Sequence, residues 1–346
     1  MRLAIVGATG EVGRMLLKCL KEFDIKFDTL DLYASMQSEG KMLSIENNSY
    51  VVRGLTSDAL KQSYDYVFFT AGSNISKEYA HIATEQGATV IDNSSAFRQE
   101  NTIPLVVPEV NGDILKSYKG IVANPNCSTI QLVLFLHPLN EYKKIKKVVV
   151  TTMQSVSGTG NSGIMELQNQ KNGSMQQKVY PRPIYMNVIP QIGEIVSTGD
   201  LYKINFCQEE LKMTFETRKI LNISDLNLVA TTVRVPVVYG HSESVYIEFD
   251  EKVSLKEVTH ILSNNRSIIH DDKYITPLEI GDSDMSHVSR IRYAGDEKSI
   301  LLWNVANNVR LGAATNAVKI MIFHNQINNT LQNLAVQSNG FERILS

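Results

Sequence analysis

The sequence has little cysteine. It contains three cysteines in 346 residues, Cys19, Cys127 and Cys207, and their odd number and wide spacing exclude a disulfide framework and a zinc-ligand pattern. Long apolar runs are also missing. The N-terminal apolar run is too short for a signal-peptide core, and no later run is long enough to span a bilayer. We therefore expect a cytoplasmic protein with no metal site and no membrane partner, in which any special cysteine is a reactive thiol.

The sequence also has no strong excess of acidic or of basic residues. The net charge is −2, and acidic and basic residues are interspersed along the chain, so we expect no nucleic-acid partner. With 346 residues, 43% of them hydrophobic, the chain has room for two cores of typical domain size.

Short apolar runs alternate with amphipathic stretches through the first third of the chain. The runs that we interpret as strands are RLAIV, TLDLYA, YVFFTA, ATVID and IVANP. This alternation is typical of a parallel sheet built from strand–helix–strand units. Beyond Cys127, residues 145–156 and 227–250 are rich in Val, Thr and Ile, and part of the second segment alternates polar with apolar residues as an antiparallel strand does.

The fold class that these patterns predict is α/β with two domains. We expect a Rossmann-like domain over residues 1–127, completed by a C-terminal helix over residues 311–346. We expect a second, α+β domain over residues 128–310, with a mixed, largely antiparallel sheet.

A glycine-rich turn follows the first predicted strand. Gly7, Gly10 and Gly13 stand in the order G-x-x-G-x-x-G between that strand and a predicted helix. Glycines permit a tight turn with the backbone close to a pyrophosphate, and the start of a helix attracts anions. The motif predicts a dinucleotide site, although such turns also occur without a nucleotide.

The end of the second predicted strand bears on which dinucleotide is bound. Asp31 lies inside this strand. Its exit carries the uncharged polar residues Ser35, Gln37 and Ser38, whereas sites specific for NAD usually have a carboxylate there. The missing carboxylate favours NADP over NAD. No arginine stands there to hold the 2′-phosphate, so NAD stays open.

Cys127 lies in the segment IVANPNCSTIQLVLF. Pro125 ends the preceding strand, Asn126 can cap a helix, and the apolar residues that follow predict the helix itself. A thiol at a helix N-terminus has a lowered pKa, and the thiolate is the form that attacks a carbonyl carbon. We therefore interpret Cys127 as a nucleophile, with a buried core cysteine as the alternative.

A thiolate beside a nicotinamide suggests attack on an aldehyde, hydride transfer to the cofactor and a thioester on the enzyme. Such a reaction needs a base. His241 lies at a glycine turn between two strand-like runs, with Arg234 seven residues earlier. An arginine grips a carboxylate with two parallel hydrogen bonds, and the alternative for Arg234 is a cation on the surface of a strand.

The chain contains, in this order, GATGEVG, FRQ, VPEVN, NPNCSTIQ, SVSG, EELKMT, VRVPV, HSESVYIE and NNVRLGAA. In these motifs, over nearly its whole length, it resembles the aspartate-β-semialdehyde dehydrogenases of bacterial type. The resemblance implies an NADP-dependent oxidoreductase of lysine, threonine and methionine biosynthesis. Through a cysteine thioester, it would interconvert L-aspartyl 4-phosphate with L-aspartate 4-semialdehyde and phosphate. A homodimer is also implied, with residues 128–310 as the catalytic and dimerisation domain.

The resemblance implies roles for individual residues as well. Cys127 would be the acyl-thioester nucleophile and His241 the acid/base group, while Gln154 would orient the intermediate. Arg234 and Glu209 would hold the carboxylate and the amine of the substrate. The positions that match phosphate-binding residues of the family are Arg98, Asn126 and Lys212. Those that match its NADP contacts are Thr9, Gly10, Glu11, Val12, Gln37, Ser38, Ser157, Gly158 and Asn308.

Ordinary structural explanations and other functions stay open at this point. Glu209 and Lys212 are three residues apart, a spacing that also suits a surface ion pair on one helix face. Another acyl-phosphate or acyl-thioester reductase is an alternative. The N-acetylglutamyl-phosphate reductases, which share the fold, usually have a glycine before the cysteine and an aromatic residue after it, where this chain has Asn126 and Ser128. A non-catalytic Rossmann binding protein is a further alternative, but it would be expected to lack the nucleophile or the base.

Overall fold

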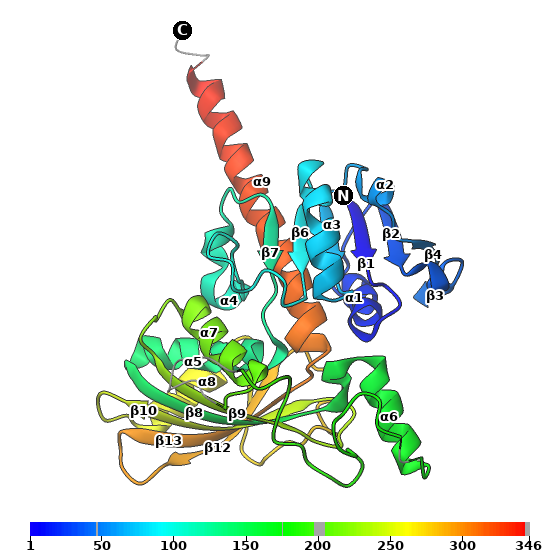
Figure 1. The fold of residues 1–346 in the computed structure, drawn as a ribbon. Helices are drawn as coiled ribbons and strands as arrows, with labels where there is room; N and C mark the ends of the chain where they lie inside the picture. The colour runs from blue at the N-terminus through cyan, green and yellow to red at the C-terminus, as the bar shows by residue number, and fades with distance from the viewer. Residues whose placement is uncertain (46–47, 175, 197–204, 343–346) are drawn as a thin grey trace. The chain divides into compact units, whose positions relative to one another are not determined.

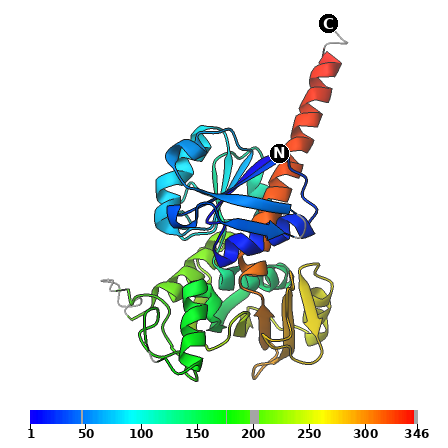
Figure 2. The ribbon, with the colours of Figure 1, turned by 90° about the vertical axis from the view of Figure 1, so that its right-hand side faces the viewer.

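The computed structural model describes residues 1–45, 48–174, 176–196 and 205–342. They divide into two compact units, shown in Figures 1 and 2. The first unit contains Met1–Ala8, Leu20–Asn124 and the chain from Asn316 onward, and the second contains Thr9–Cys19 and Pro125–Thr315. The first unit therefore ends before the predicted boundary at residue 127, because Asn126 and Cys127 form the start of a helix that belongs to the second unit.

The first unit is built on a seven-stranded sheet with the strand order β3-β4-β2-β1-β5-β6-β7. All neighbouring strands of this sheet are parallel except β3, which runs antiparallel to β4. The strands are β1 (Arg2–Val6), β2 (Thr29–Ala34), β3 (Met42–Ile45), β4 (Asn48–Gly54), β5 (Tyr66–Phe69), β6 (Thr89–Asp92) and β7 (Ile121–Ala123). Every residue of β5, β6 and β7 is buried, and most of these residues are apolar, as is typical of parallel strands that are covered on both faces. The prediction of a parallel Rossmann-like sheet is confirmed.

The C-terminal helix returns to the first unit, as predicted. Asn316 donates through its side-chain amide to Val106 O at 2.9 Å and to Asn124 Oδ1 at 2.7 Å. This helix, α9 (Asn316–Glu342), begins later than the predicted residue 311 because Arg310–Thr315 form a π-helical turn, η5, within the second unit. The other helices of the first unit are η1 (Met36–Ser38), α2 (Ser57–Leu60), α3 (Ser73–Glu85), α4 (Pro108–Asn111) and η2 (Gly112–Leu115). Helix α1 (Glu11–Glu22) begins in the segment grouped with the second unit.

The second unit is built on a six-stranded mixed sheet with the order β11-β12-β13-β10-β8-β9. The pairs β8/β9 and β11/β12 are parallel and the other three are antiparallel, as predicted. The strands are β8 (Ile145–Gln154), β9 (Asn227–Arg234), β10 (His241–Phe249), β11 (Ile268–Asp271), β12 (Ser286–Tyr293) and β13 (Ser299–Ala306). The helices are α5 (Cys127–Tyr142), η3 (Val156–Thr159), α6 (Asn161–Lys171), α7 (Gln208–Leu221) and α8 (Leu255–Ser263).

Helices α5, α7 and α8 cover one face of this second sheet (Figure 1). Alternate residues of β8 and β10, such as Val150 and Val245, pack there against Phe135 of α5. The same alternation continues to the ends of the strands, where polar residues replace apolar ones on the covered face. Gln154 ends β8 and His241 begins β10, and both are buried. The core of the second unit therefore ends in buried polar residues at these strand ends.

No helix in the described part of the chain is long and apolar enough to cross a membrane.

Candidate active site

Cys127 is the first residue of α5, as predicted. Asn126 precedes it with an extended backbone (φ −60, ψ 144), and its Oδ1 accepts the N–H groups of Ser128 at 3.0 Å and Thr129 at 3.4 Å. The thiol of Cys127 is partly exposed, whereas Cys19 and Cys207 are buried. The N-terminus of a helix stabilises a thiolate through its dipole and its N–H groups. Cys207 also stands at a helix start, as the N-cap of α7, but it is buried, so Cys127 is the cysteine that combines a helix start with partial exposure.

Helix α7 holds the residue that caps the nucleophile helix. Asn126 donates its side-chain Nδ2 to Glu209 Oε1 at 2.7 Å and its backbone N–H to Glu216 Oε2 at 2.6 Å. Glu209 Oε2 in turn lies 3.5 Å from Lys212 Nζ. The predicted ion pair on one helix face is therefore present, but Glu209 is buried rather than on the surface. Sequence reasoning missed Glu216, although it stands two helical turns after Glu209 and so shares its face.

Gly312, in the π-helical turn η5, lies directly against the nucleophile. A Cβ at this position would be 2.7 Å from Cys127 Cβ and 3.0 Å from Cys127 Cα. Carbon atoms in contact lie about 3.5–4.0 Å apart. The close approach of η5 to the start of α5 thus requires a glycine at this position.

His241 is fully buried at the start of β10, and its ring is oriented by Ser155. The Ser155 backbone N–H donates to Nδ1 at 3.1 Å, and the Ser155 hydroxyl lies 3.0 Å from the same atom. A backbone N–H can only donate, so Nδ1 is an acceptor and the neutral ring carries its proton on Nε2. Within the described residues, Nε2 is buried without a hydrogen-bond partner. Nε2–H is therefore free to donate a hydrogen bond to a substrate oxygen.

Arg234 and His241 both contact Ser155, an arrangement that the sequence alone does not show. Arg234 Nη1 donates to Ser155 O at 2.6 Å, so one residue contacts both side chains. Gly158 makes room for them, because a Cβ there would be 2.9 Å from Arg234 Nη1 and 3.4 Å from His241 Nε2. Burial, and then the positive charge of Arg234, hold the pKa of His241 well below its usual value. The ring is therefore neutral at physiological pH.

Gln154 pairs directly with Arg234 in the register of β8 and β9. Its side chain is buried, and its Nε2 donates to Thr152 Oγ1 at 3.3 Å. Gln154 and Arg234 therefore end adjacent strands on the covered face of the sheet.

Asn308 and Ser157, two predicted cofactor contacts, form a buried cluster behind the histidine. Asn308 Oδ1 accepts the N–H of Gly240 at 2.9 Å and the hydroxyl of Ser155 at 3.0 Å, and Asn308 Nδ2 donates to Ser157 Oγ at 3.0 Å. Gly240 directly precedes His241 and has φ +91. The cluster therefore fixes the turn from which the histidine projects.

A buried glutamate that sequence reasoning did not single out lies two residues beyond the histidine. Glu243 is fully buried on the covered face of β10, and its Oε2 accepts from Asn304 Nδ2 at 3.1 Å. Desolvation raises the pKa of Glu243 to about 8. The carboxyl group is therefore protonated over most of the physiological range.

The glycine-rich turn of the first unit has the geometry that a dinucleotide site needs. Strand β1 ends at Val6 and α1 begins at Glu11. Gly7 between them has φ +90, and a Cβ there would lie 2.7 Å from Thr70 Oγ1 and 2.8 Å from Ala71 N. The first N–H groups of a helix have no partners inside that helix and attract phosphate. The turn thus fits a pyrophosphate.

The exit of β2, residues 35–38, has no acidic residue, and the first one beyond it is Glu39. Asp31 lies inside β2, as predicted, where it accepts from Tyr64 OH at 2.8 Å and pairs with Arg53 at 3.2 Å. Gln37 and Ser38 lie in η1 just beyond the strand. Lys41 Nζ donates to Ser38 Oγ at 3.3 Å, so a positive charge lies near the end of β2. This lysine was not identified from the sequence.

Arg98 is buried in the first unit and anchored by main-chain oxygens. Its Nε donates to Asn124 O and its Nη2 to Asn93 O, both at 2.9 Å. These bonds fix the direction of a guanidinium that the sequence predicts to bind phosphate.

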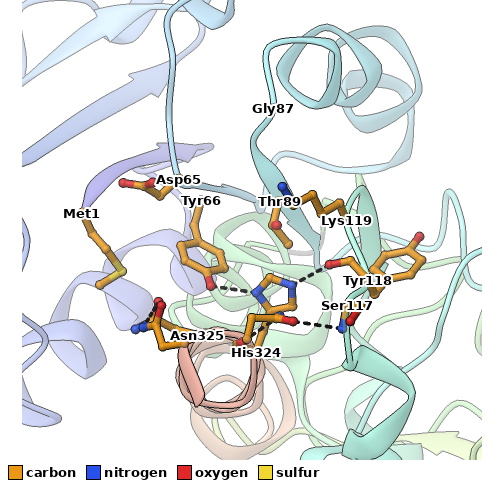
Figure 3. A pocket seen from close by; sticks show the side chains of 12 residues that line it. Met1, Asp65, Tyr66, Gly87, Thr89, Ser117, Tyr118, Lys119, His324 and Asn325 are labelled. Atoms are coloured by element: carbon orange, nitrogen blue, oxygen red, sulfur yellow. Dashed lines mark hydrogen bonds between the residues drawn. The ribbon is translucent and has the colours of Figure 1, made fainter. Parts of the chain in front are cut away.

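A cavity of about 550 Å³ in the first unit lies apart from these residues (Figure 3). Tyr66 and Thr89, at the amino ends of β5 and β6, line it together with His324 of α9. His324 is bonded on both ring nitrogens, to Tyr66 OH at 2.7 Å and to Tyr118 O at 2.8 Å. Rossmann-like sheets bind ligands at the carboxyl ends of their strands. This cavity is therefore not the dinucleotide site, and His324 has a structural role.

The residues that the structure describes contain no group of three or more side chains that could hold a metal ion.

Two protein families match the chain. The semialdehyde dehydrogenase NAD binding domain matches residues 2–118, and the semialdehyde dehydrogenase dimerisation domain matches residues 136–311. Aspartate-semialdehyde dehydrogenases from Aquifex aeolicus and Campylobacter jejuni are each 42% identical to this chain, over 92% of its length and 96% of theirs. The crystal structure of aspartate semialdehyde dehydrogenase II from Vibrio cholerae, complexed with ASA, is 38% identical with a TM-score of 0.88, covering 93% of this chain and 97% of that one.

Proposed function

The chain belongs to the aspartate-semialdehyde dehydrogenase family, and from this membership we propose what each residue of the site does. The enzyme catalyses the reversible reductive dephosphorylation of L-aspartyl 4-phosphate to L-aspartate 4-semialdehyde in amino-acid biosynthesis. The observation that carries the residue assignments is Cys127 at the capped start of α5. An N-acetylglutamyl-phosphate reductase is not favoured, because Asn126 and Ser128 flank the cysteine. In addition, the similar proteins described above are aspartate-semialdehyde dehydrogenases.

In the biosynthetic direction, the Cys127 thiolate attacks the acyl carbon of aspartyl phosphate. A sulfur–carbon bond forms, the bond from carbon to the phosphate oxygen breaks, and phosphate leaves with the electron pair, so that a thioester remains on the enzyme. We assign the phosphate-binding groups to Arg98, Asn126 and Lys212. Cationic and amide donors of this kind stabilise the charge of the departing phosphate.

Arg234 and Glu209 hold the two charged groups of the α-carbon, at the end of the substrate that does not react. The planar guanidinium of Arg234 suits the α-carboxylate, and the buried carboxylate of Glu209 suits the ammonium group. Gln154, which pairs with Arg234 across β8 and β9, orients the acyl group. Holding both groups of the α-carbon fixes the orientation of the substrate and brings its acyl carbon into a defined position before attack.

His241 acts on the substrate oxygen through Nε2, because its Nδ1 is occupied by Ser155. When the thioester is reduced, the oxygen becomes negatively charged, and the Nε2–H group stabilises it by a hydrogen bond. In the reverse direction, Cys127 adds to the aldehyde as a thiolate, so the oxygen again becomes negatively charged and accepts the hydrogen bond of the same Nε2–H group. We assign the acid/base role of His241 to this one atom, as the proton donor to the substrate oxygen.

The enzyme binds a nicotinamide dinucleotide, which when bound supplies the hydride that reduces the thioester. The contacts that we propose in the first chain segment are Gly7, Thr9, Gly10, Glu11, Val12, Gly13, Ser35, Gln37 and Ser38, and those farther along are Ser157, Gly158 and Asn308. NADP is the preferred form, since Asp31 is already bonded to Tyr64 and Arg53. Lys41 supplies a positive charge for the 2′-phosphate where the family often has an arginine.

We propose that two copies of the chain associate through the sheet of the second unit, since residues 136–311 match a dimerisation domain. The sheet face opposite α5, α7 and α8 carries an apolar row across four neighbouring strands, formed by Val229, Val149, Tyr246 and Leu301. Val149 and Val229 are 36% and 38% exposed in the single chain, so a second copy would bury them. Sedimentation velocity measures the oligomeric state directly.

Phosphate-dependent oxidation of L-aspartate 4-semialdehyde tests the proposed function. We expect turnover that requires phosphate, with a higher kcat/KM for NADP than for NAD. Cys127→Ala should abolish turnover while it leaves dinucleotide binding unchanged, because only the nucleophile is removed. Activity that persists in Cys127→Ala would refute the thioester scheme, and equal kcat/KM values for the two dinucleotides would refute the NADP assignment.

A further inference from the structure

We infer that Glu216 of α7 is a positioning residue for the Cys127 nucleophile. The inference rests on the proposed function in one respect, which is that Cys127 is the reacting thiol. Glu216 is 1% exposed, and its Oε2 accepts the backbone N–H of Asn126 at 2.6 Å. This bond fixes the peptide unit that leads into the nucleophile.

Every polar group of Asn126 has a hydrogen-bond partner. Its backbone N–H donates to Glu216 and its Nδ2 donates to Glu209. Its Oδ1 caps α5, and its main-chain oxygen accepts the N–H of Ile130 at 2.9 Å. The last two bonds are those of any capped helix. The two glutamates come from a different helix, so α7 determines where the start of α5 lies.

This arrangement ties the nucleophile to the substrate-binding helix. Glu209 and Lys212, the proposed partners of the substrate amine and phosphate, stand on the same α7 as Glu216. A displacement of the nucleophile by about 1 Å can cost about 100-fold in rate even when binding is intact. We therefore expect Glu216 to affect kcat much more than KM.

Glu210 provides a matched control on the same helix. It is 8% exposed, and its carboxylate also accepts main-chain N–H groups, from Cys207 at 2.9 Å and from Thr232 at 3.2 Å. Neither partner belongs to α5 or to its cap. A variant of Glu210 therefore perturbs a buried glutamate of α7 that bonds to these two residues rather than to Asn126, which makes it the control for a general effect on the helix.

Two substitutions distinguish the effect of side-chain length at Glu216 from the effect of its negative charge. Glu216→Gln keeps an oxygen at the same reach and removes the charge, whereas Glu216→Asp keeps the carboxylate and shortens the side chain by one methylene. Both retain a polar group in the buried position, which favours folding. The test measures kcat and KM for semialdehyde oxidation, the thermal midpoint, and the rate at which iodoacetamide alkylates Cys127, followed on its own peptide by mass spectrometry.

We expect Glu216→Asp to lower kcat about 10-fold or more with KM changed less than about threefold, and to slow the alkylation of Cys127. Glu216→Gln should stay within about threefold of the parent in kcat, because the acceptor is retained. Glu210→Asp should lower the thermal midpoint as much as Glu216→Asp does while kcat is retained.

The inference is overturned if Glu216→Asp keeps the parental kcat, if Glu216→Gln loses as much as Glu216→Asp, or if Glu210→Asp loses the same kcat. Alkylation needs no substrate. If the parent protein does not oxidise the semialdehyde, the proposed function fails, and the alkylation rates of the variants still decide the role of Glu216.

Discussion

Replacing Gly312 with alanine places a methyl group against the nucleophile. The new Cβ would lie 2.7 Å from Cys127 Cβ, 3.0 Å from its Cα and 3.2 Å from its main-chain oxygen. Contact between carbons is comfortable from about 3.5 Å. All three atoms belong to the first residue of α5 rather than to the end of a flexible side chain, so the start of the helix or η5 itself must move by roughly 0.5–1 Å.

The magnitude follows from this displacement. Overpacking of a tight interior costs about 1–3 kcal/mol, and for a unit of this size each kcal/mol lowers the thermal midpoint by about 2–4 °C. A shift of the thiol of up to about 1 Å costs up to about 100-fold in kcat. We therefore expect Gly312→Ala to lose about 10- to 100-fold in kcat and a few degrees in thermal midpoint.

The assay compares Gly312→Ala with Gly112→Ala in phosphate-dependent turnover and thermal unfolding. At Gly112 a Cβ would meet the ring of Phe323 at 2.9 Å, within the first unit. The atoms that this Cβ would meet belong to a side-chain ring and not to Cys127, so we expect Gly112→Ala to keep kcat and to lose less thermal stability than Gly312→Ala. A Gly312→Ala enzyme with parental kcat would refute the reasoning, and so would an equal loss of kcat in both variants.

Three further predictions address the substrate, the cofactor and pH. Arg234→Lys keeps the charge but loses the planar fork, so kcat/KM for the semialdehyde should fall by about 100-fold, corresponding to a few kcal/mol; an unchanged kcat/KM would remove Arg234 from the site. Lys41→Ala should raise KM for NADP about 10-fold and leave KM for NAD within about twofold, because only NADP has a 2′-phosphate; equal changes for both cofactors would contradict the assignment. Burial raises the pKa of Glu243 from 4.5 to about 8, so between these values the native state holds a proton that the unfolded state releases, and the free energy of unfolding falls as pH rises. Glu243→Gln keeps a neutral side chain and should make the thermal midpoint fall less between pH 5 and pH 8 than in the parent, whereas an identical slope would show that Glu243 does not titrate in this range.

Local chemistry made much of this protein predictable from its sequence. Pro125 and Asn126 end a strand and cap a helix through their own backbone preferences, so the setting of Cys127 could be predicted without knowledge of the fold. The parallel sheet of the first unit followed in the same way from short apolar runs of the right length. The observed start of α9 differs from the predicted one because the π-helical turn at Arg310–Thr315 has the same apolar character as a helix.

Contacts between distant segments could not be predicted in this way. Glu216 lies 90 residues from Asn126, and its place in the site depends on how α7 packs on α5. The sequence around Gly312 likewise does not show that a glycine is needed there, because the need arises from the close approach of η5 to Cys127. The proximity of His241 and Arg234 depends on the pairing of three strands, which no local pattern specifies.

The register of β8, β9 and β10 has a consequence for how this protein can change during evolution. Side chains alternate between the two faces of a sheet, so inserting or deleting one residue within a strand sends every later side chain to the opposite face. In β9 such a change would move Arg234 away from the helices while the sheet itself could still form. A β-bulge can absorb an extra residue, as the register shift between Glu248 and Phe249 opposite β8 shows. Single-residue length changes in these strands are therefore compatible with catalysis only where a bulge restores the alternation, and length variation among active homologues should be confined to the loops and to such bulges.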